Sequence, residues 1–144
     1  MESPIKVFSS WVLSGKDDGM EKNHYGSVKN MIEYSTKEIG KFSFLDAGCG
    51  NGWVIRNISS NPNCVKAIGV DGSSNMIQKA KRLDNKNDYF CSDLLHWSPE
   101  NKVDIVHSME VFYYFDNPET VIKHIYNKWL KKGGRLIMGI DHYK

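Results

Sequence analysis

The sequence predicts one α/β domain, in which helices flank a doubly wound, mostly parallel β-sheet of Rossmann-like type. Two observations lead to this fold class. Short apolar runs alternate with helix-like patterns along residues 41–141. In addition, a chain of 144 residues with 40% hydrophobic content can bury one core but not two. Ligands of such sheets bind beyond the carboxyl ends of the strands, so the predicted site lies at that edge.

Residues 1–41 are predicted to form an N-terminal helical segment ahead of the sheet. Within it, residues 17–40 favour one or two helices whose inner face carries Val28, Met31 and Ile32, with Ile39 as a further candidate. We expect these helices to pack across one flank of the sheet. The stretch "GMEKNHY", residues 19–25, allows a second interpretation. Short polar and aromatic segments with a glycine hinge often close over active sites, so this stretch is also a candidate flap.

Residues 42–144 are predicted to form the core of the domain, which contains the strands and their crossover helices. Ser73 stands where the N-cap of the second core helix is expected. The predicted elements are a strand at 41–48, a helix at 53–59, a strand at 65–72, a helix at 73–83, and strands at 88–93 and 103–112.

The C-terminal pattern predicts a complete helix over residues 117–134 and a fifth strand over 135–141. Pro118 stands in the first turn, while Lys131 and Lys132 precede two glycines at the end, and these are start and stop signals. An open edge on the fifth strand would expose unpaired main-chain groups. We therefore expect self-association through this edge.

Composition argues against several classes of protein. A formal charge of +2 is far from the basic excess of a dedicated nucleic-acid binder. Cys49, Cys64 and Cys91 show neither CxxC spacing nor clustered histidines, so we expect no disulfide framework, no metal site and a reducing, cytoplasmic setting. No window approaches the roughly 18 to 20 apolar residues of a membrane-spanning helix, so no membrane partner is expected.

The stretch "FLDAGCGNGW" places glycines at alternate positions directly after an apolar strand that ends in an acid. Gly48, Gly50 and Gly52 permit a tight turn with positive φ and let main-chain amides approach a ligand closely. A dinucleotide fingerprint would need a third glycine where Trp53 stands, which disfavours a nicotinamide-dependent oxidoreductase. A merely tight strand-to-helix turn is the alternative without a ligand.

The pattern D-x-G-x-G-x-G in "LDAGCGNG" resembles the glycine loop of class I S-adenosylmethionine-dependent methyltransferases. The resemblance implies that Gly48, Gly50 and Gly52 pass under the methionine and ribose part of the cofactor. It also implies that Asp46 helps to anchor the methionine amino end. A positively charged sulfonium cofactor would explain why bare main chain and a carboxylate stand together.

Further positions agree with the resemblance. Asp71 ends the second predicted strand at nearly the interval, about 20 residues past the first glycine, at which an acid binds ribose hydroxyls. The family pattern implies cofactor contacts for Asp71 and Gly72, an adenine contact for Met76, and contacts to the adenine amino group and ring for Asp93 and Leu94. Taken singly, Asp71 could be a helix cap, Met76 a core residue and Asp93 a loop acid.

The resemblance covers residues 42–141, and Asp46, Asp71 and Asp93 end successive strands on one edge of the predicted sheet. "LKKGG" is similar to a Leu-Lys-Pro-Gly-Gly turn of the family, with Lys132 in place of proline. Family members usually continue into strands 6 and 7, which are lacking here. We expect the chain to be a C-terminally incomplete enzyme, the alternative being a naturally short cofactor-binding module.

The resemblance implies an enzyme that transfers a methyl group from S-adenosylmethionine to a small-molecule acceptor by in-line displacement, leaving S-adenosylhomocysteine. Orientation can supply much of the rate, and any general base would lie near the fourth strand or the flap. His107, Tyr113 and His24 are the catalytic candidates, although His107 could instead adjoin the cofactor. Further candidates are Glu110, Tyr114 and Tyr25.

The region after the fourth strand argues against a nucleic-acid substrate. It reads "HSMEVFYYF" and lacks the Asp/Asn-Pro-Pro-aromatic signature of enzymes that methylate base amino groups, and the chain has no Pro-Cys nucleophile. The aromatic residues 112–115 resemble acceptor-binding loops of small-molecule methyltransferases. A non-catalytic module that binds the same cofactor and needs a partner or a missing C-terminal region remains the alternative function.

Overall fold

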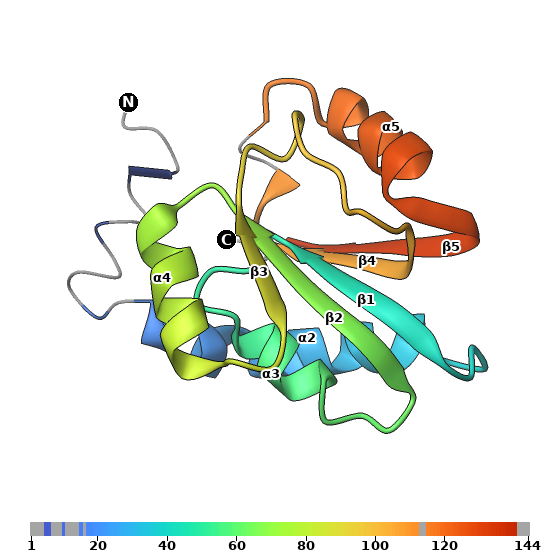
Figure 1. Ribbon diagram of the computed structural model, residues 1–144, viewed down its shortest axis with the longest axis horizontal. Helices are drawn as coiled ribbons and strands as arrows, with labels where there is room; N and C mark the ends of the chain where they lie inside the picture. Colours follow the sequence, from blue (N-terminus) through green and yellow to red (C-terminus); the bar gives the residue numbers. More distant parts are fainter. Residues whose placement is uncertain (1–4, 7–9, 11–14, 16, 113–114, 141–144) are drawn as a thin grey trace.

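The computed structural model describes residues 5–6, 10, 15, 17–112 and 115–140 (Figure 1). This part contains one five-stranded parallel sheet with strand order β3-β2-β1-β4-β5, flanked by helices, which confirms the predicted fold class. The strands are β1 (Phe42–Ala47), β2 (Cys64–Asp71), β3 (Asp88–Cys91), β4 (Val103–Met109) and β5 (Leu130–Gly139). The helices are α2 (Asp18–Ser35), α3 (Trp53–Ile58), α4 (Ser74–Leu83) and α5 (Pro118–Lys128).

Helices cover both faces of the sheet: α2, α3 and α4 lie on one side and α5 on the other (Figure 1). Alternate residues of β1 pack on the two faces of the sheet, because successive side chains of a strand point in opposite directions. Phe42 and Phe44 pack in the cluster with α2, α3 and α4, whereas Leu45 and Ala47 pack in the cluster with α5. All six residues of β1 are buried, as expected for a central parallel strand.

Helix α2 runs without interruption through Gly19 and Gly26 and packs against α3 and β5. Val28 is fully buried and Ile32 is partly buried against the same cluster. The candidate flap, residues 19–25, therefore forms the first turns of one continuous helix.

Helix α4 begins as the sequence predicts, with Ser73 as its N-cap accepting a hydrogen bond from the Met76 amide at 3.3 Å. Pro118 likewise occupies the first turn of α5. These caps fix where each helix leaves the carboxyl edge of the sheet.

The last predicted helix is wrong at its C-terminal end. The sequence pattern predicts a helix over residues 117–134, but α5 ends at Lys128. Leu130 already pairs with Val103 of β4, and regular pairing resumes only at Arg135. Pairing with β4 therefore competes successfully with helix formation, and the residues between form a bulge.

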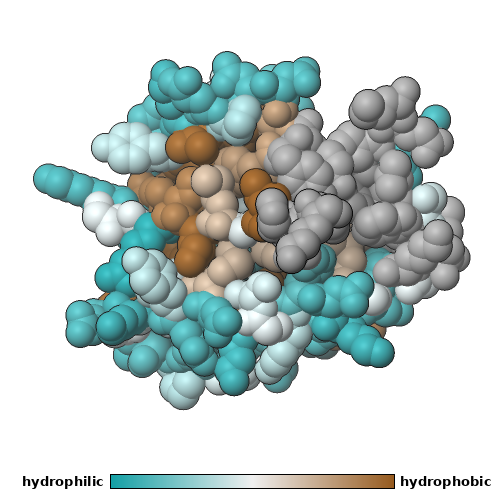
Figure 2. Space-filling model, turned by 180° about the vertical axis from the view of Figure 1, so that it is seen from behind, coloured by the Kyte–Doolittle hydropathy of each residue, from teal (hydrophilic) through white to brown (hydrophobic). Residues whose placement is uncertain are grey.

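Strand β5 forms one edge of the sheet and has no strand on its outer side among the described residues. Met138 and Ile140 on this edge are exposed, at 44% and 58%. Figure 2 shows an apolar area on the rear face, bordered above and below by hydrophilic side chains. In the described ranges no helix has the length and apolar character needed to cross a membrane.

Candidate functional site

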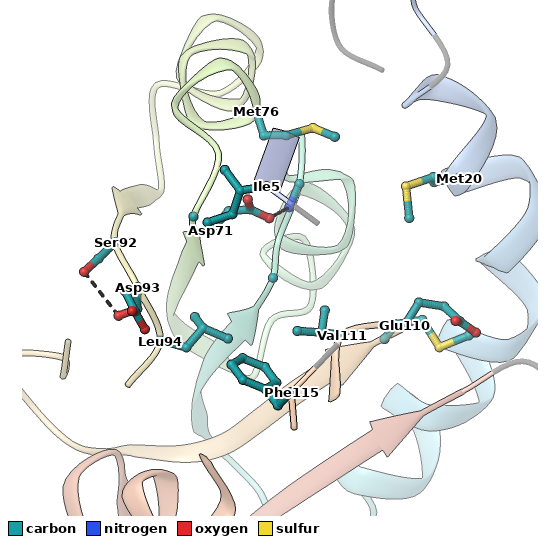
Figure 3. A pocket seen from close by; sticks show the side chains of 14 residues that line it. Ile5, Met20, Asp71, Met76, Ser92, Asp93, Leu94, Glu110, Val111 and Phe115 are labelled. Atoms are coloured by element: carbon teal, nitrogen blue, oxygen red, sulfur yellow. Dashed lines mark hydrogen bonds between the residues drawn. The ribbon is translucent and has the colours of Figure 1, made fainter. Parts of the chain in front are cut away.

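A cavity of about 260 Å³, called the main cavity here because it lies at the carboxyl edge of the sheet, opens where the carboxyl ends of β1, β2, β3 and β4 converge (Figure 3). This is the edge at which doubly wound sheets bind ligands. Asp71, Asp93 and Leu94 lie on one side of the cavity, and Met20 and Glu110 lie on the other (Figure 3). The predicted site residues that line it are Gly48, Gly50, Asp71, Gly72, Met76, Asp93 and Leu94.

The glycine loop follows β1 and presents bare main chain to the main cavity. Gly50 has φ 54°, and a Cβ built there would meet only the Met76 Sδ, at 3.8 Å. Gly48 has φ 78°, and a Cβ there would come within 2.3 Å of Val111. Gly52 also has a positive φ but faces the Tyr89 ring instead of the cavity. The loop thus combines a tight turn, whose positive φ angles glycine adopts without strain, with open space over Gly50.

Asp71 at the end of β2 fixes the glycine loop. Its Oδ2 accepts a hydrogen bond from the Gly50 amide at 2.9 Å, and its Oδ1 accepts one from the Ser73 amide at 2.8 Å. Burial raises the pKa of Asp71, these two hydrogen bonds lower it in part, and the nearby Asp46 raises it further. Each carboxylate oxygen can accept a second hydrogen bond, so Asp71 can still receive hydroxyl donors.

Asp93 lies two residues past β3 with a half-exposed side chain. Its Oδ1 accepts a hydrogen bond from the Leu95 amide at 2.8 Å, and its Oδ2 lies 3.2 Å from the His96 Nδ1. These contacts lower the pKa of Asp93, with the Leu95 amide as the largest cause. Asp93 is therefore a charged acceptor at the cavity wall beside the buried Leu94.

The inner cavity is a smaller space of about 40 Å³ between the glycine loop and the start of α2. Asp46 lines this cavity and not the main one. The two cavities share wall residues, among them Gly48, Gly50 and Met76, so they adjoin at the glycine loop. His24 also lines the inner cavity and is buried.

His107 lies behind Asp46 and lines neither cavity. The two residues are register partners on β4 and β1, and the His107 Nδ1 lies 2.8 Å from the Asp46 Oδ1. The His107 ring is fully buried and stacks on Phe44 with centroids 5.7 Å apart. Its Nε2 has no hydrogen-bond partner among the described residues. This geometry places His107 in contact with Asp46 and away from the cavity walls.

The other candidate bases separate in space. Glu110 lines the main cavity and His24 the inner one. Tyr25 instead lines a groove between α2 and α3. Tyr113 and Tyr114 lie outside the described residues.

Sequence reasoning missed Asp17 and included Met20 only as part of the candidate flap, residues 19–25, whereas both residues line the inner cavity. With His24 they follow a spacing of three and then four residues, which places side chains on one helix face. That spacing was the available signal. It was not decisive, because the sequence does not reveal that this face meets the glycine loop.

Residues 45–138 match a family described as a methyltransferase domain. The chain belongs to the class I S-adenosylmethionine-dependent methyltransferases. Over 112 residues this methyltransferase domain is 32% identical to the putative methyltransferase 235L of Invertebrate iridescent virus 6, covering 78% of the chain and 42% of that protein. It is 30% identical over 99 residues to the malonyl-[acyl-carrier protein] O-methyltransferase of Priestia megaterium, covering 67% and 36%. The chain thus spans about two fifths of the length of these relatives.

Solved structures show the same fold. A putative methyltransferase in complex with the Trm112 methyltransferase activator of Haloferax volcanii superposes with a TM-score of 0.81 at 27% identity, over 96% of this domain and 60% of that chain. The plantazolicin methyltransferase BpumL, in complex with S-adenosylhomocysteine and a monoazolic desmethylPZN analog, superposes with a TM-score of 0.75 at 22% identity, over 93% of this domain and 59% of that chain. At this identity the second comparison supports the fold alone.

Proposed function

We propose that this methyltransferase domain binds S-adenosylmethionine in the main cavity and serves in methyl transfer to a small-molecule acceptor. The observation that carries the proposal is the main cavity itself, where exposed main chain at Gly50 meets the fixed carboxylate of Asp71 at the carboxyl edge of the sheet. This arrangement suits a nucleoside that brings hydroxyl donors and needs close contact with main chain.

The residues of the main cavity fit the cofactor. Asp71 can accept ribose hydroxyls, and Asp93 can accept an exocyclic amino group. Met76 and Leu94 provide soft, apolar contacts for an aromatic base. Bound S-adenosylmethionine would supply a methyl carbon activated by the adjacent positively charged sulfur. The carboxylates around the cavity favour a ligand that carries positive charge.

The remaining wall of the main cavity is proposed to hold the acceptor. Val111, Phe115 and Met20 give it an apolar character, and Glu110 adds one carboxylate (Figure 3). Such a wall orients a small molecule and excludes water, and orientation alone can supply about 7–11 kcal/mol in well-placed reactions. If the acceptor must lose a proton, Glu110 and His24 are the candidate bases that line the cavities among the described residues.

Two relatives support a small or carrier-bound acceptor. One is the malonyl-[acyl-carrier protein] O-methyltransferase, and another is a trans-aconitate 2-methyltransferase of Rhizobium rhizogenes. Both names describe methylation of a small acid or its carrier-bound form. The comparison supports the class of acceptor and leaves its identity open to a metabolite screen.

Calorimetry with S-adenosylhomocysteine and with NAD tests the cofactor assignment. We expect saturable heat with S-adenosylhomocysteine and none with NAD at the same concentrations. Because both ligands contain adenosine, NAD is the matched control for generic nucleotide binding. Binding of NAD without binding of S-adenosylhomocysteine would overturn the proposal and favour an oxidoreductase.

A second candidate function is a cofactor-binding unit that needs further polypeptide for turnover. The exposed apolar residues Met138 and Ile140 on the edge of β5 favour it, because such edges are usually covered. The Haloferax neighbour, solved as a complex with an activator, supports it as well. Consumption of S-adenosylmethionine against a metabolite panel separates the two: binding without consumption of the cofactor favours the second candidate.

A further inference from the structure

Asp17, just before α2, is a buried carboxylate, and among the described residues only one of its two oxygens has hydrogen-bond partners. The residue is 2% exposed. Its Oδ2 accepts a hydrogen bond from the Asn51 Nδ2 at 3.0 Å and lies 2.9 Å from the Lys79 Nζ. Its Oδ1 is buried and has no hydrogen-bond partner in the described part of the chain. Because Asp17 lines the inner cavity, a strong hydrogen-bond acceptor borders that cavity.

The orientation of Asn51 is determined by its surroundings. The Asn51 Oδ1 accepts a hydrogen bond from the Trp53 amide at 3.1 Å, so the Nδ2 is the group that faces Asp17. Asn51 belongs to the glycine loop, and Lys79 belongs to α4. Asp17 is thus held against the cofactor-binding loop by two partners, both on the same oxygen.

Asp46 supplies a second carboxylate to the inner cavity from the opposite element, β1. It is 3% exposed, and its Oδ1 is joined to His107. Lys79 pairs with the Asp17 Oδ2 but does not line the inner cavity, and the described residues that line it include His24 but neither lysine nor arginine. Two buried carboxylates that share a small space repel each other unless a positive charge lies between them. A cavity of about 40 Å³ has room for a group the size of an ammonium.

The family resemblance already implies that Asp46 helps to anchor the amino end of the cofactor; we propose that Asp17 is a second acceptor for this protonated α-amino group, which it meets in the inner cavity. This inference rests on the proposed function and adds a residue to its site. Asp17 lies ahead of the family match at residues 45–138. The N-terminal segment, residues 1–41, therefore contributes a binding residue to the core, residues 42–144, and covers the amino-acid end of the cofactor.

The test compares two ligands that differ in the group in question. S-adenosylhomocysteine carries the amino-acid portion, whereas methylthioadenosine has the same adenosine and a thioether but no amino-acid portion, and therefore no α-amino group. We expect Asp17→Asn to weaken binding of S-adenosylhomocysteine by about tenfold or more, the effect of losing a charge-assisted hydrogen bond. Affinity for methylthioadenosine should stay the same, which also shows that the variant is folded. Asp46→Asn should show the same selectivity.

Asp18→Asn is the matched control. It removes the same charge one residue away and also removes a partner of Lys79, at 2.8 Å, but its side chain is 67% exposed and does not line the inner cavity. We expect unchanged affinity for both ligands. An equal loss of both ligands in Asp17→Asn, or no loss of either, would overturn the role of Asp17. Failure of the unmodified protein to bind either ligand would instead overturn the proposed function.

Discussion

At the scale of single residues, Asp71 shows how a binding carboxylate can be prepared before the ligand arrives. Main-chain amides on both sides fix its two oxygens, so little side-chain freedom remains to be lost on binding. Its raised pKa reflects burial first and the neighbouring Asp46 last, with the two amides acting in the opposite sense. The protein thus maintains a carboxylate in a position that is unfavourable without a ligand.

Replacement of Asp71 by alanine tests this role. We expect S-adenosylhomocysteine to bind about tenfold more weakly or worse, because charged hydrogen bonds to the ribose are lost. Methylthioadenosine should lose affinity by a similar factor, since it contains the same ribose. Calorimetry measures both, and Asp88→Ala at the opposite end of the sheet serves as control. An Asp71→Ala variant with undiminished affinity would contradict the ribose assignment.

His107 is best explained as a positioning residue for Asp46. Replacement by phenylalanine keeps an aromatic ring beside Phe44 but removes the hydrogen bond to a buried carboxylate. We expect a loss of unfolding free energy of about 1–3 kcal/mol, the cost of a buried acceptor without its partner. Urea unfolding measures it. Adding Asp46→Leu to the variant should recover stability, because the unpaired charge disappears, and a second loss of similar size would argue against the coupling.

At the scale of elements, local sequence patterns predicted the strands better than they predicted the contacts between distant segments. The apolar run of β1 and the acid at the end of β2 are visible in the sequence because buried parallel strands are continuously apolar. The contact between Asp17 and Asn51 spans 34 positions and depends on how α2 docks, which no local pattern contains. The end of α5 at Lys128 was also not predictable from a local pattern, because it is set by the pairing of the following residues with β4.

The outer edge of β5, which has no neighbouring strand in the described part of the chain, is predicted to support self-association. Unpaired main-chain groups and exposed apolar side chains on an edge strand favour pairing with a second copy. We expect Met138→Lys to reduce concentration-dependent association, because a charged side chain on an edge opposes strand pairing. Light scattering coupled to size-exclusion chromatography measures the mass. Val65→Lys, at an exposed apolar position on β2, is the control, and a monomer at every concentration before mutation would exclude the association.

At the scale of the whole molecule, carboxylates also join neighbouring elements by hydrogen bonds at places away from the candidate site. The Asp104 Oδ2 accepts hydrogen bonds from the Ser43 amide and hydroxyl, at 2.8 and 3.0 Å, and so joins β4 to β1 at their amino ends. The Asp84 Oδ2 accepts hydrogen bonds from the Tyr89 hydroxyl at 2.6 Å and from the Asn87 Nδ2 at 2.8 Å, and these bonds close the turn between α4 and β3. In both carboxylates, partial burial raises the pKa, but the hydrogen bonds, together with the charge of Lys131 beside Asp104, outweigh burial and lower the pKa overall.

These lowered pKa values predict acid sensitivity. The contribution of Asp84 and Asp104 to stability is present above their ordinary pKa of 3.8 and is lost as the pH falls through their lower folded values. Asp71 acts in the opposite sense, because its raised pKa disfavours the folded state as the pH rises and the group ionises. Urea unfolding between neutral pH and about pH 3 measures the slope of the unfolding free energy against pH, because the carboxyl groups of an unfolded chain titrate within this range. Asp104→Asn should flatten it, while Glu119→Gln on the exposed face of α5 should leave it unchanged. A slope unaffected by Asp104→Asn would show that other carboxylates govern acid unfolding.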